Sequence, residues 1–254
     1  MKIIATIEAR MGSSRLPGKS IRPIIGKPML ELMIERVKCC NQIDDIVVAT
    51  STNKKDDVIE ELTSKLHVNC FRGSEDDVLD RVLHAAKMVK ADIILELWGD
   101  CPLIDPKILD DLVIFYKNNS VDCCGTVLPN FKKEFPLGIS ALIFSTEILN
   151  DISKITQNSE DRENVSNYIY EHPEKYKILP LPCPTNLSFP EFRLVVDEEN
   201  DFELIKIIFE ELYPQNPNFQ TLEIINFLNN NPNLVSINKD VEQKRLSSWK
   251  KFNH

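Results

Sequence analysis

The feature that most constrains the fold of this chain is the alternation of two kinds of segment through its first half. Short apolar or β-branched runs, which are typical of buried strands, occur at residues 2–7, 44–51, 68–73 and 92–98. Amphipathic stretches with helical spacing follow them, at residues 28–40, 56–66, 76–90 and 106–118. This order predicts right-handed βαβ crossovers, and therefore an α/β fold with a mainly parallel sheet and helices on both faces.

Residues 128–190 interrupt this rhythm. We predict a loop at 128–140, a strand at 141–145 and a helix at 159–176, with Ser159 as its candidate cap. We interpret the segment as a small inserted subregion that covers the sheet or pairs with another subunit. After it, residues 192–212 predict a strand, an acidic turn and a helix, and further helices are expected at 221–232 and 240–253. The 254 residues are read as a single domain.

Charge and composition exclude several classes of function. The formal net charge of −9 argues against a general nucleic-acid or membrane-surface binder. No apolar run approaches the ~20 residues of a membrane span, and the N-terminus does not resemble a secretory signal, so we expect a cytoplasmic protein. Seven cysteines without a C-x-x-C pair, and only four histidines, weigh against a zinc site.

The stretch ARMGSSRLPGKS, residues 9–20, follows the first predicted strand and concentrates positive charge. Residues 1–27 hold six cations, and Glu8 is their only anion. A glycine-containing loop after a strand can direct backbone N–H groups at an anion, and arginine and lysine side chains add charge. We predict a triphosphate cradle; the alternative is a flexible, solvated basic loop. The spacing matches neither the Walker P-loop nor G-x-G-x-x-G.

Two carboxylates follow predicted strands and are candidate magnesium ligands. Asp100 lies in GDCPLID, just past the strand at 92–98, and should share one crevice with the basic loop. Its alternative role is that of a turn aspartate before Pro102. Asp197 follows the β-branched run RLVV and could complete the metal site. We assign the acidic residues after it, Glu198, Glu199 and Asp201, to the N-terminal charge of a helix.

Three further side chains have two interpretations each. Arg81 either belongs to a capped helix start or points back toward the nucleotide. Arg162 and Glu163 lie either on a solvated helix face, which we favour, or in an acceptor pocket.

Six stretches together resemble one protein family over nearly the whole chain. They are ARMGSSRLPGK, GDCPLIDP, SEDDVLDR, SEDRENVSNYIYEHPEKY, RLVVDEENDFELI and INKDVEQK. The chain resembles the spore-coat polysaccharide biosynthesis protein F family, which is related to the cytidylyltransferases that activate sialic acid and Kdo. The resemblance implies a Rossmann-like fold of the nucleotide-diphospho-sugar transferase type, nucleotidyl transfer with release of pyrophosphate, and a dimer whose interface includes the inserted subregion.

The resemblance also implies roles for individual residues. Arg10, Ser13, Arg15 and Lys19 would hold the triphosphate, and Asp100 and Asp197 would hold Mg²⁺. The catalytic set is Arg10, Arg15, Lys19 and Asp100. The full nucleotide-binding set is Ala9, Arg10, Met11, Gly12, Ser13, Ser14, Arg15, Lys19, Ser51, Arg81 and Asp100. The acceptor-binding set is Gly138, Ser140, Arg162 and Glu163.

The chain departs from the family pattern at three positions. Glu8 replaces an expected glutamine, Trp98 replaces threonine or a small residue, and Ser140 replaces an acidic residue. The last change falls where the acceptor should bind. Losing a carboxylate there could remove a partner for a sugar hydroxyl or an amine, or it could signal a phosphorylated acceptor.

These observations predict an Mg²⁺-dependent nucleotidyltransferase that activates a sugar or a small phosphorylated acceptor for surface polysaccharide or glycan synthesis. CTP is the favoured donor, on the resemblance alone. One alternative is a guanylyltransferase that acts on a sugar 1-phosphate. Alternatives from other classes are a nucleotide-binding regulatory module without catalysis and an interaction subunit that uses residues 128–190.

Overall fold

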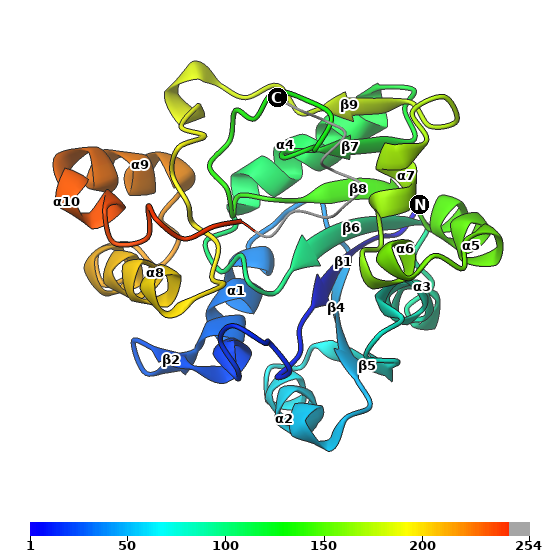
Figure 1. Cartoon of the computed structure of the whole chain (residues 1–254), viewed down its shortest axis with the longest axis horizontal. Helices are drawn as coiled ribbons and strands as arrows, with labels where there is room; N and C mark the ends of the chain where they lie inside the picture. The colour runs from blue at the N-terminus through cyan, green and yellow to red at the C-terminus, as the bar shows by residue number, and fades with distance from the viewer. Residues whose placement is uncertain (244–254) are drawn as a thin grey trace.

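The computed structural model describes residues 1–243 and has one central seven-stranded sheet (Figure 1). Its strand order is β5-β4-β1-β6-β8-β7-β9. The strands are β1 (Ile3–Glu8), β4 (Asp45–Ser51), β5 (Asn69–Gly73), β6 (Ile93–Trp98), β7 (Cys123–Gly125), β8 (Leu142–Ser145) and β9 (Ile178–Pro180). Only β8 runs antiparallel to its neighbours. A separate two-stranded hairpin joins β2 (Pro23–Ile24) to β3 (Lys27–Pro28). The predicted α/β fold with a mainly parallel sheet is confirmed.

Helices cover both faces of this sheet because alternate strand residues point to opposite sides. Along β1, Ile4 packs into one hydrophobic cluster, and Ala5 and Ile7 pack into the other. The cluster with Ile7 includes residues of α1 (Met29–Val37), α2 (Asp57–Lys65), α4 (Pro106–Asn118), α8 (Glu199–Leu212) and α9 (Thr221–Asn230). The cluster with Ile4 includes residues of α3 (Val78–Met88), α5 (Thr146–Ile155) and α7 (Asn167–Glu171). Figure 1 accordingly shows α8, α9 and α10 (Pro232–Val235) on one side of the molecule, and α3, α5 and α6 (Ser159–Glu163) on the other.

Residues 128–190 add strands to the same sheet. β8 pairs antiparallel with β6, and β9 pairs parallel with β7. The side chain of Ser145 caps α5 by accepting a hydrogen bond from the Ile148 amide. Among the described residues, no helix is long and apolar enough to cross a membrane.

The single helix predicted at 159–176 was wrong, because two short helices, α6 and α7, occupy its place. The N-cap of α6 is Asn158 rather than Ser159, because the Asn158 side chain accepts a hydrogen bond from the Glu160 amide. The break has a local cause. Buried Asp161 accepts hydrogen bonds from Thr156 before it (2.6 Å) and Asn167 after it (2.7 Å). The chain therefore folds around one carboxylate instead of continuing as a helix.

The strand predicted after residue 192 was also wrong. The segment 193–197 is extended, but its hydrogen bonds go to loops. The Leu194 amide donates to the Leu137 carbonyl (2.6 Å), and the Val196 amide donates to the Asp100 carbonyl (2.8 Å). This path brings Asp197 beside the end of β6. The tail helix predicted at 240–253 lies, from residue 244 on, outside the described residues.

Candidate active site

The candidate site lies where the parallel strands β1 and β6 end side by side. Glu8 and Trp98 are register partners at these ends, and the Gly99 amide donates to the Glu8 carbonyl (2.8 Å). A β-carbon at Gly99 would lie 2.5 Å from that carbonyl oxygen, so the close approach requires glycine. The basic loop and the GDCPLID segment therefore meet at one edge of the sheet, as the sequence predicted.

The loop at residues 9–18 has a defined shape because both of its ends are tied down. The Met11 amide donates to Asp56 (2.8 Å), and Gly18 closes the loop in the left-handed region (φ 73°) with its amide on the Met11 carbonyl (3.1 Å). Within it, Ser13 accepts from the Leu16 amide (3.2 Å). Burial raises the pKa of Asp56, but hydrogen bonds from Ser51 and Met11 outweigh it, and the net pKa is lowered. Asp56 therefore anchors the loop as a carboxylate.

Lys19 is the meeting point of the site. It begins the short 3₁₀ turn η1 (Lys19–Ile21), directly after Gly18. Its ammonium lies 3.1 Å from Asp100 and 3.5 Å from Asp197, and it donates to the Val196 carbonyl (2.6 Å). Three segments that are far apart in sequence thus converge on one cation.

The two arginines of the loop pair with carboxylates on opposite sides. Arg15 lies 2.9 Å from Asp197 and 3.7 Å from Glu198. Arg10 lies 3.5 Å from Glu75, which also accepts from Asn53. An incoming polyphosphate would exchange with these carboxylates, which bidentate arginine geometry permits.

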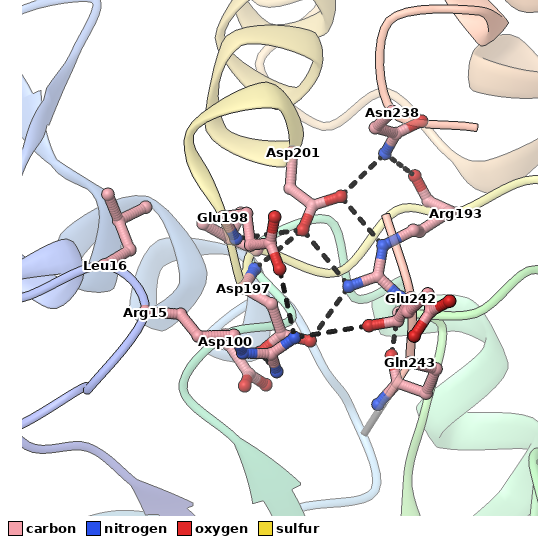
Figure 2. Close-up of polar contacts among 12 residues, drawn as sticks. Arg15, Leu16, Asp100, Arg193, Asp197, Glu198, Asp201, Asn238, Glu242 and Gln243 are labelled. Atoms are coloured by element: carbon pink, nitrogen blue, oxygen red, sulfur yellow. Dashed lines mark hydrogen bonds and ion pairs between the residues drawn. The ribbon is translucent and has the colours of Figure 1, made fainter. Parts of the chain in front are cut away.

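Arg193 organises the acidic side of the site, as Figure 2 shows. Its guanidinium donates to Asp201 (2.8 and 3.1 Å) and to Asp197 (2.9 Å). Asp201 is fully buried, accepts from Asn238 (2.9 Å), and also completes a capping box with Glu198 at the start of α8. The sequence analysis missed Arg193 and gave Asp201 only its helix-terminal role.

Asp100 and Asp197 fit a magnesium ion on the chemistry of their donor atoms. Both carboxylates approach one cation, Lys19, and the Val196 carbonyl approaches it as well. These are hard oxygen ligands, and magnesium is typically held by one or two carboxylates with substrate phosphates and waters.

The remaining predicted nucleotide residues lie in or below the loop. Ala9 and Ser51 are buried, and the Ser51 hydroxyl donates to Asp56 (2.5 Å). Gly12 and Ser14 are exposed on the loop. Arg81 is buried and donates to the carbonyls of Ser74 and Glu75, so it supports the neighbouring loop from below.

The four predicted acceptor residues have separate contacts in the structure. Gly138 and Ser140 are buried in the loop that contacts Leu194, and Ser140 accepts from the Gly138 amide (3.3 Å). Arg162 pairs with Asp77, the cap of α3, rather than lying on a solvated face. Glu163 is exposed.

Comparisons with known proteins agree with this geometry. A family model described as cytidylyltransferase matches residues 4–247. The spore coat polysaccharide biosynthesis protein SpsF of Bacillus subtilis is 36% identical over 240 residues, covering 92% of this chain and 97% of that protein. An uncharacterized protein of Methanocaldococcus jannaschii is 37% identical over 244 residues, covering 96% and 97% of the two chains.

Solved structures give the same result. A cytidylyltransferase from Leptospira borgpetersenii superposes with a TM-score of 0.87 at 33% identity, covering 96% of this chain and 100% of that one. A CMP:2-keto-3-deoxy-manno-octonic acid synthetase complexed with CTP superposes with a TM-score of 0.62 at 19% identity, covering 84% and 100%. The second likeness is one of fold.

Proposed function

The chain belongs to the cytidylyltransferase family, and we propose on that premise that it is an Mg²⁺-dependent enzyme that transfers the cytidylyl group of CTP to a sugar acceptor for surface polysaccharide or glycan synthesis. An acceptor oxygen attacks the α-phosphorus of CTP and loses its proton. The bond from the α-phosphorus to the bridging oxygen breaks, and pyrophosphate leaves.

The single observation that carries this proposal is the convergence on Lys19. Its ammonium contacts both Asp100 and Asp197 at the mouth of the basic loop. A cation between two carboxylates, one of which also pairs with Arg15, suits a substrate that brings both phosphates and a metal. A solvated basic loop would require none of these contacts.

The residues of the site take complementary roles in this reaction. Lys19, Arg10 and Arg15 stabilise the charge that builds on the departing pyrophosphate. Asp100 and Asp197 would hold Mg²⁺, which supplies charge neutralisation at the substrate phosphates when it is bound. Arg193 keeps Asp197 in place because its guanidinium donates both to Asp197 and to the buried Asp201. The chemistry then depends on alignment and electrostatics rather than on a covalent protein nucleophile.

The partners we propose are CTP and a small-molecule acceptor. The name of the Bacillus subtilis relative places that protein in spore coat polysaccharide synthesis, which supports a sugar. We also propose a cytoplasmic homodimer, in which residues 128–190 contribute to the interface. Light scattering on the purified full chain tests the dimer, and a monomer at micromolar concentration would contradict it.

Pyrophosphate release tests the proposed function. The protein is incubated with Mg²⁺, each of the four nucleoside triphosphates, and a panel of sugar acids, amino sugars and sugar phosphates. We expect release with CTP, and a loss of at least ~100-fold in Asp100→Asn. The matched control is Asp111→Asn, which changes an exposed aspartate on α4. Release from no triphosphate would favour a regulatory module, and full activity in Asp100→Asn would contradict the metal assignment.

A further inference from the structure

The stretch INKDVEQK, which is part of the family resemblance, has no role in the proposed reaction. Its residues 238–243 lie beside the acidic side of the site, and we call them the C-terminal segment. Figure 2 shows Asn238, Glu242 and Gln243 of this segment next to Arg193. A turn shapes the segment, because the Val241 amide donates to the Asn238 carbonyl (3.1 Å). Both ends of the segment therefore reach residues of the site.

The C-terminal segment holds Arg193 at its backbone and at its guanidinium. Asn238 is only 2% exposed, and its side-chain amide donates to the Arg193 carbonyl (3.0 Å) and to Asp201 (2.9 Å). Gln243 accepts from the Nη1 atom of Arg193 (2.5 Å), while Nε and Nη2 donate to Asp201. All three guanidinium nitrogens are thus engaged, which fixes the orientation of the group.

This orientation matters because the two oxygens of Asp197 have different partners. Its Oδ2 atom accepts from Arg193 (2.9 Å). Its Oδ1 atom faces Arg15 (2.9 Å) and Lys19 (3.5 Å). In the proposed reaction Arg15 and Lys19 turn to the phosphates, so Oδ1 becomes available to the metal while Arg193 still holds Oδ2. Outer partners of this kind orient metal ligands and tune metal affinity.

We infer that the C-terminal segment is part of the active site, and that Asn238 and Gln243 are positioning residues that act on Asp197 through Arg193. This inference rests on the proposed function, because it takes Asp197 as a metal ligand. The segment also reaches the phosphate side of the site, since the Glu242 carbonyl lies 3.4 Å from Arg15. The motif at the end of the family resemblance thereby gains a function in magnesium-dependent nucleotide binding.

Amide hydrogen exchange on the ligand-free full-length protein tests the positioning itself. The amides of Asp197 and Glu198 both donate to Asp201 (3.0 Å each), so their exchange rates report how firmly this network is held. Losing one hydrogen bond should speed their exchange about fivefold in Gln243→Ala, and losing two should speed it about tenfold or more in Asn238→Ala. The matched control is Gln157→Ala, which truncates an exposed glutamine outside the site and should change neither rate.

Titration calorimetry with CTP, in the presence and absence of Mg²⁺, tests the consequence for the metal. Gln243→Ala should reduce the strengthening of CTP binding by Mg²⁺ about fivefold, which is less than the 10–100-fold typical for a direct partner of a ligand. Gln243→Glu keeps an acceptor for Arg193 and should stay within about twofold of the unsubstituted protein. Affinity for CTP without Mg²⁺ should be the same in all these proteins. A purely structural role would instead lower the urea midpoint and leave the Mg²⁺ dependence unchanged.

Three results would overturn the inference. They are unaltered exchange at Asp197 and Glu198 in both alanine variants, unaltered Mg²⁺ dependence in Gln243→Ala, and failure of Gln243→Glu to retain that dependence. Because Gln243 is exposed, its variants should fold even if Asn238→Ala does not. Absence of CTP binding by the unsubstituted protein would overturn the proposed function, and the exchange rates would still decide whether the C-terminal segment holds Asp197.

Discussion

At the scale of single residues, Glu8 links stability to pH. Burial raises its pKa from 4.5 to about 7. A carboxyl whose folded-state pKa is raised stabilises the fold below its unfolded pKa, and that contribution is lost as the pH rises through the folded pKa. We therefore expect the melting temperature to fall between pH 5 and pH 8 by more in the unsubstituted protein than in Glu8→Gln. An equal change in melting temperature with pH in both proteins would contradict a raised pKa of Glu8.

Arg193 carries the second prediction at this scale. Arg193→Met leaves the fully buried Asp201 without its guanidinium partner. Losing one member of a buried pair costs about 3–5 kcal/mol, so urea denaturation should show a loss of this size. The matched control, Arg22→Met, breaks an ion pair to the exposed Glu199 and a contact with the Phe202 ring, and should cost only ~1 kcal/mol. Equal losses in the free energy of unfolding would mean that the pair of Arg193 with Asp201 contributes no more than an exposed ion pair.

At the scale of elements, Gly138 sets the path of the segment that carries Asp197. Its φ is +104°, and a β-carbon would lie 2.4 Å from the Leu194 carbonyl. Gly26 is also left-handed (φ +79°), but nothing lies within 4 Å of a β-carbon there. Gly26→Ala should therefore cost only the backbone strain of ~1–2 kcal/mol, and Gly138→Ala should cost at least ~2 kcal/mol more. Gly138→Ala should also weaken CTP–Mg²⁺ binding. Equal losses of stability in Gly26→Ala and Gly138→Ala would contradict the close packing of Gly138 against Leu194.

Elements with a strong local pattern could be predicted from the sequence. The central-sheet strands β1, β4, β5 and β6 and the helices α1 to α4 follow from apolar periodicity, which is a property of neighbouring residues. The three-residue strands β7 and β9 were not predicted, because they exist only through pairing with β8 and with each other. The segment 193–197 was predicted as a strand from its apolar and β-branched residues. It is not a strand in the structure, because its backbone hydrogen bonds go to loops instead of to a neighbouring strand.

The residues of the candidate site likewise fall into those that a local sequence pattern predicts and those that depend on tertiary contacts. The basic loop and Asp100 could be located because each follows a strand, and parallel strand ends share one edge. The roles of Arg193 and Asp56 could not be found this way. Asp56 binds the Met11 amide, which is 45 residues away, and the pair of Arg193 with Asp201 stands out only because Asp201 is buried. Glu8 and Trp98 gave a signal as departures from the family pattern, and both lie near Glu96: the Glu8 carboxyl is hydrogen-bonded to it, and Trp98 lines a small cavity with it.

At the scale of the whole molecule, CTP should act as a stabilising ligand. A ligand that binds only the folded state raises stability by about 2.7 kcal/mol at 100 times its dissociation constant. For a chain of 254 residues, each kcal/mol corresponds to about 2–4 °C, so the expected rise in melting temperature is about 5–11 °C. CTP with Mg²⁺ should produce this shift, and excess EDTA should reduce it. An equal shift with and without EDTA would argue that the phosphates bind through the basic loop alone.

The charge distribution of the molecule fits the expected dependence of CTP binding on Mg²⁺. The chain is acidic overall, and its first 27 residues are strongly basic. Lys19, Arg10 and Arg15 each lie against a carboxylate from another segment. If the proposed function holds, we expect phosphates and metal to enter together, because phosphates alone would release Asp100 and Asp197 from their cations without replacing the lost charge.

The affinity for CTP as a function of Mg²⁺ concentration tests the central claim most directly. Asp100→Asn suits this test because the polar contacts of the Asp100 side chain are with Lys19 and Cys101, so the fold should persist. Titration calorimetry should show that Mg²⁺ strengthens CTP binding to the unsubstituted protein by about tenfold or more, and that Asp100→Asn abolishes this strengthening. The same Mg²⁺ dependence in both proteins would contradict the assignment of Asp100 to the metal.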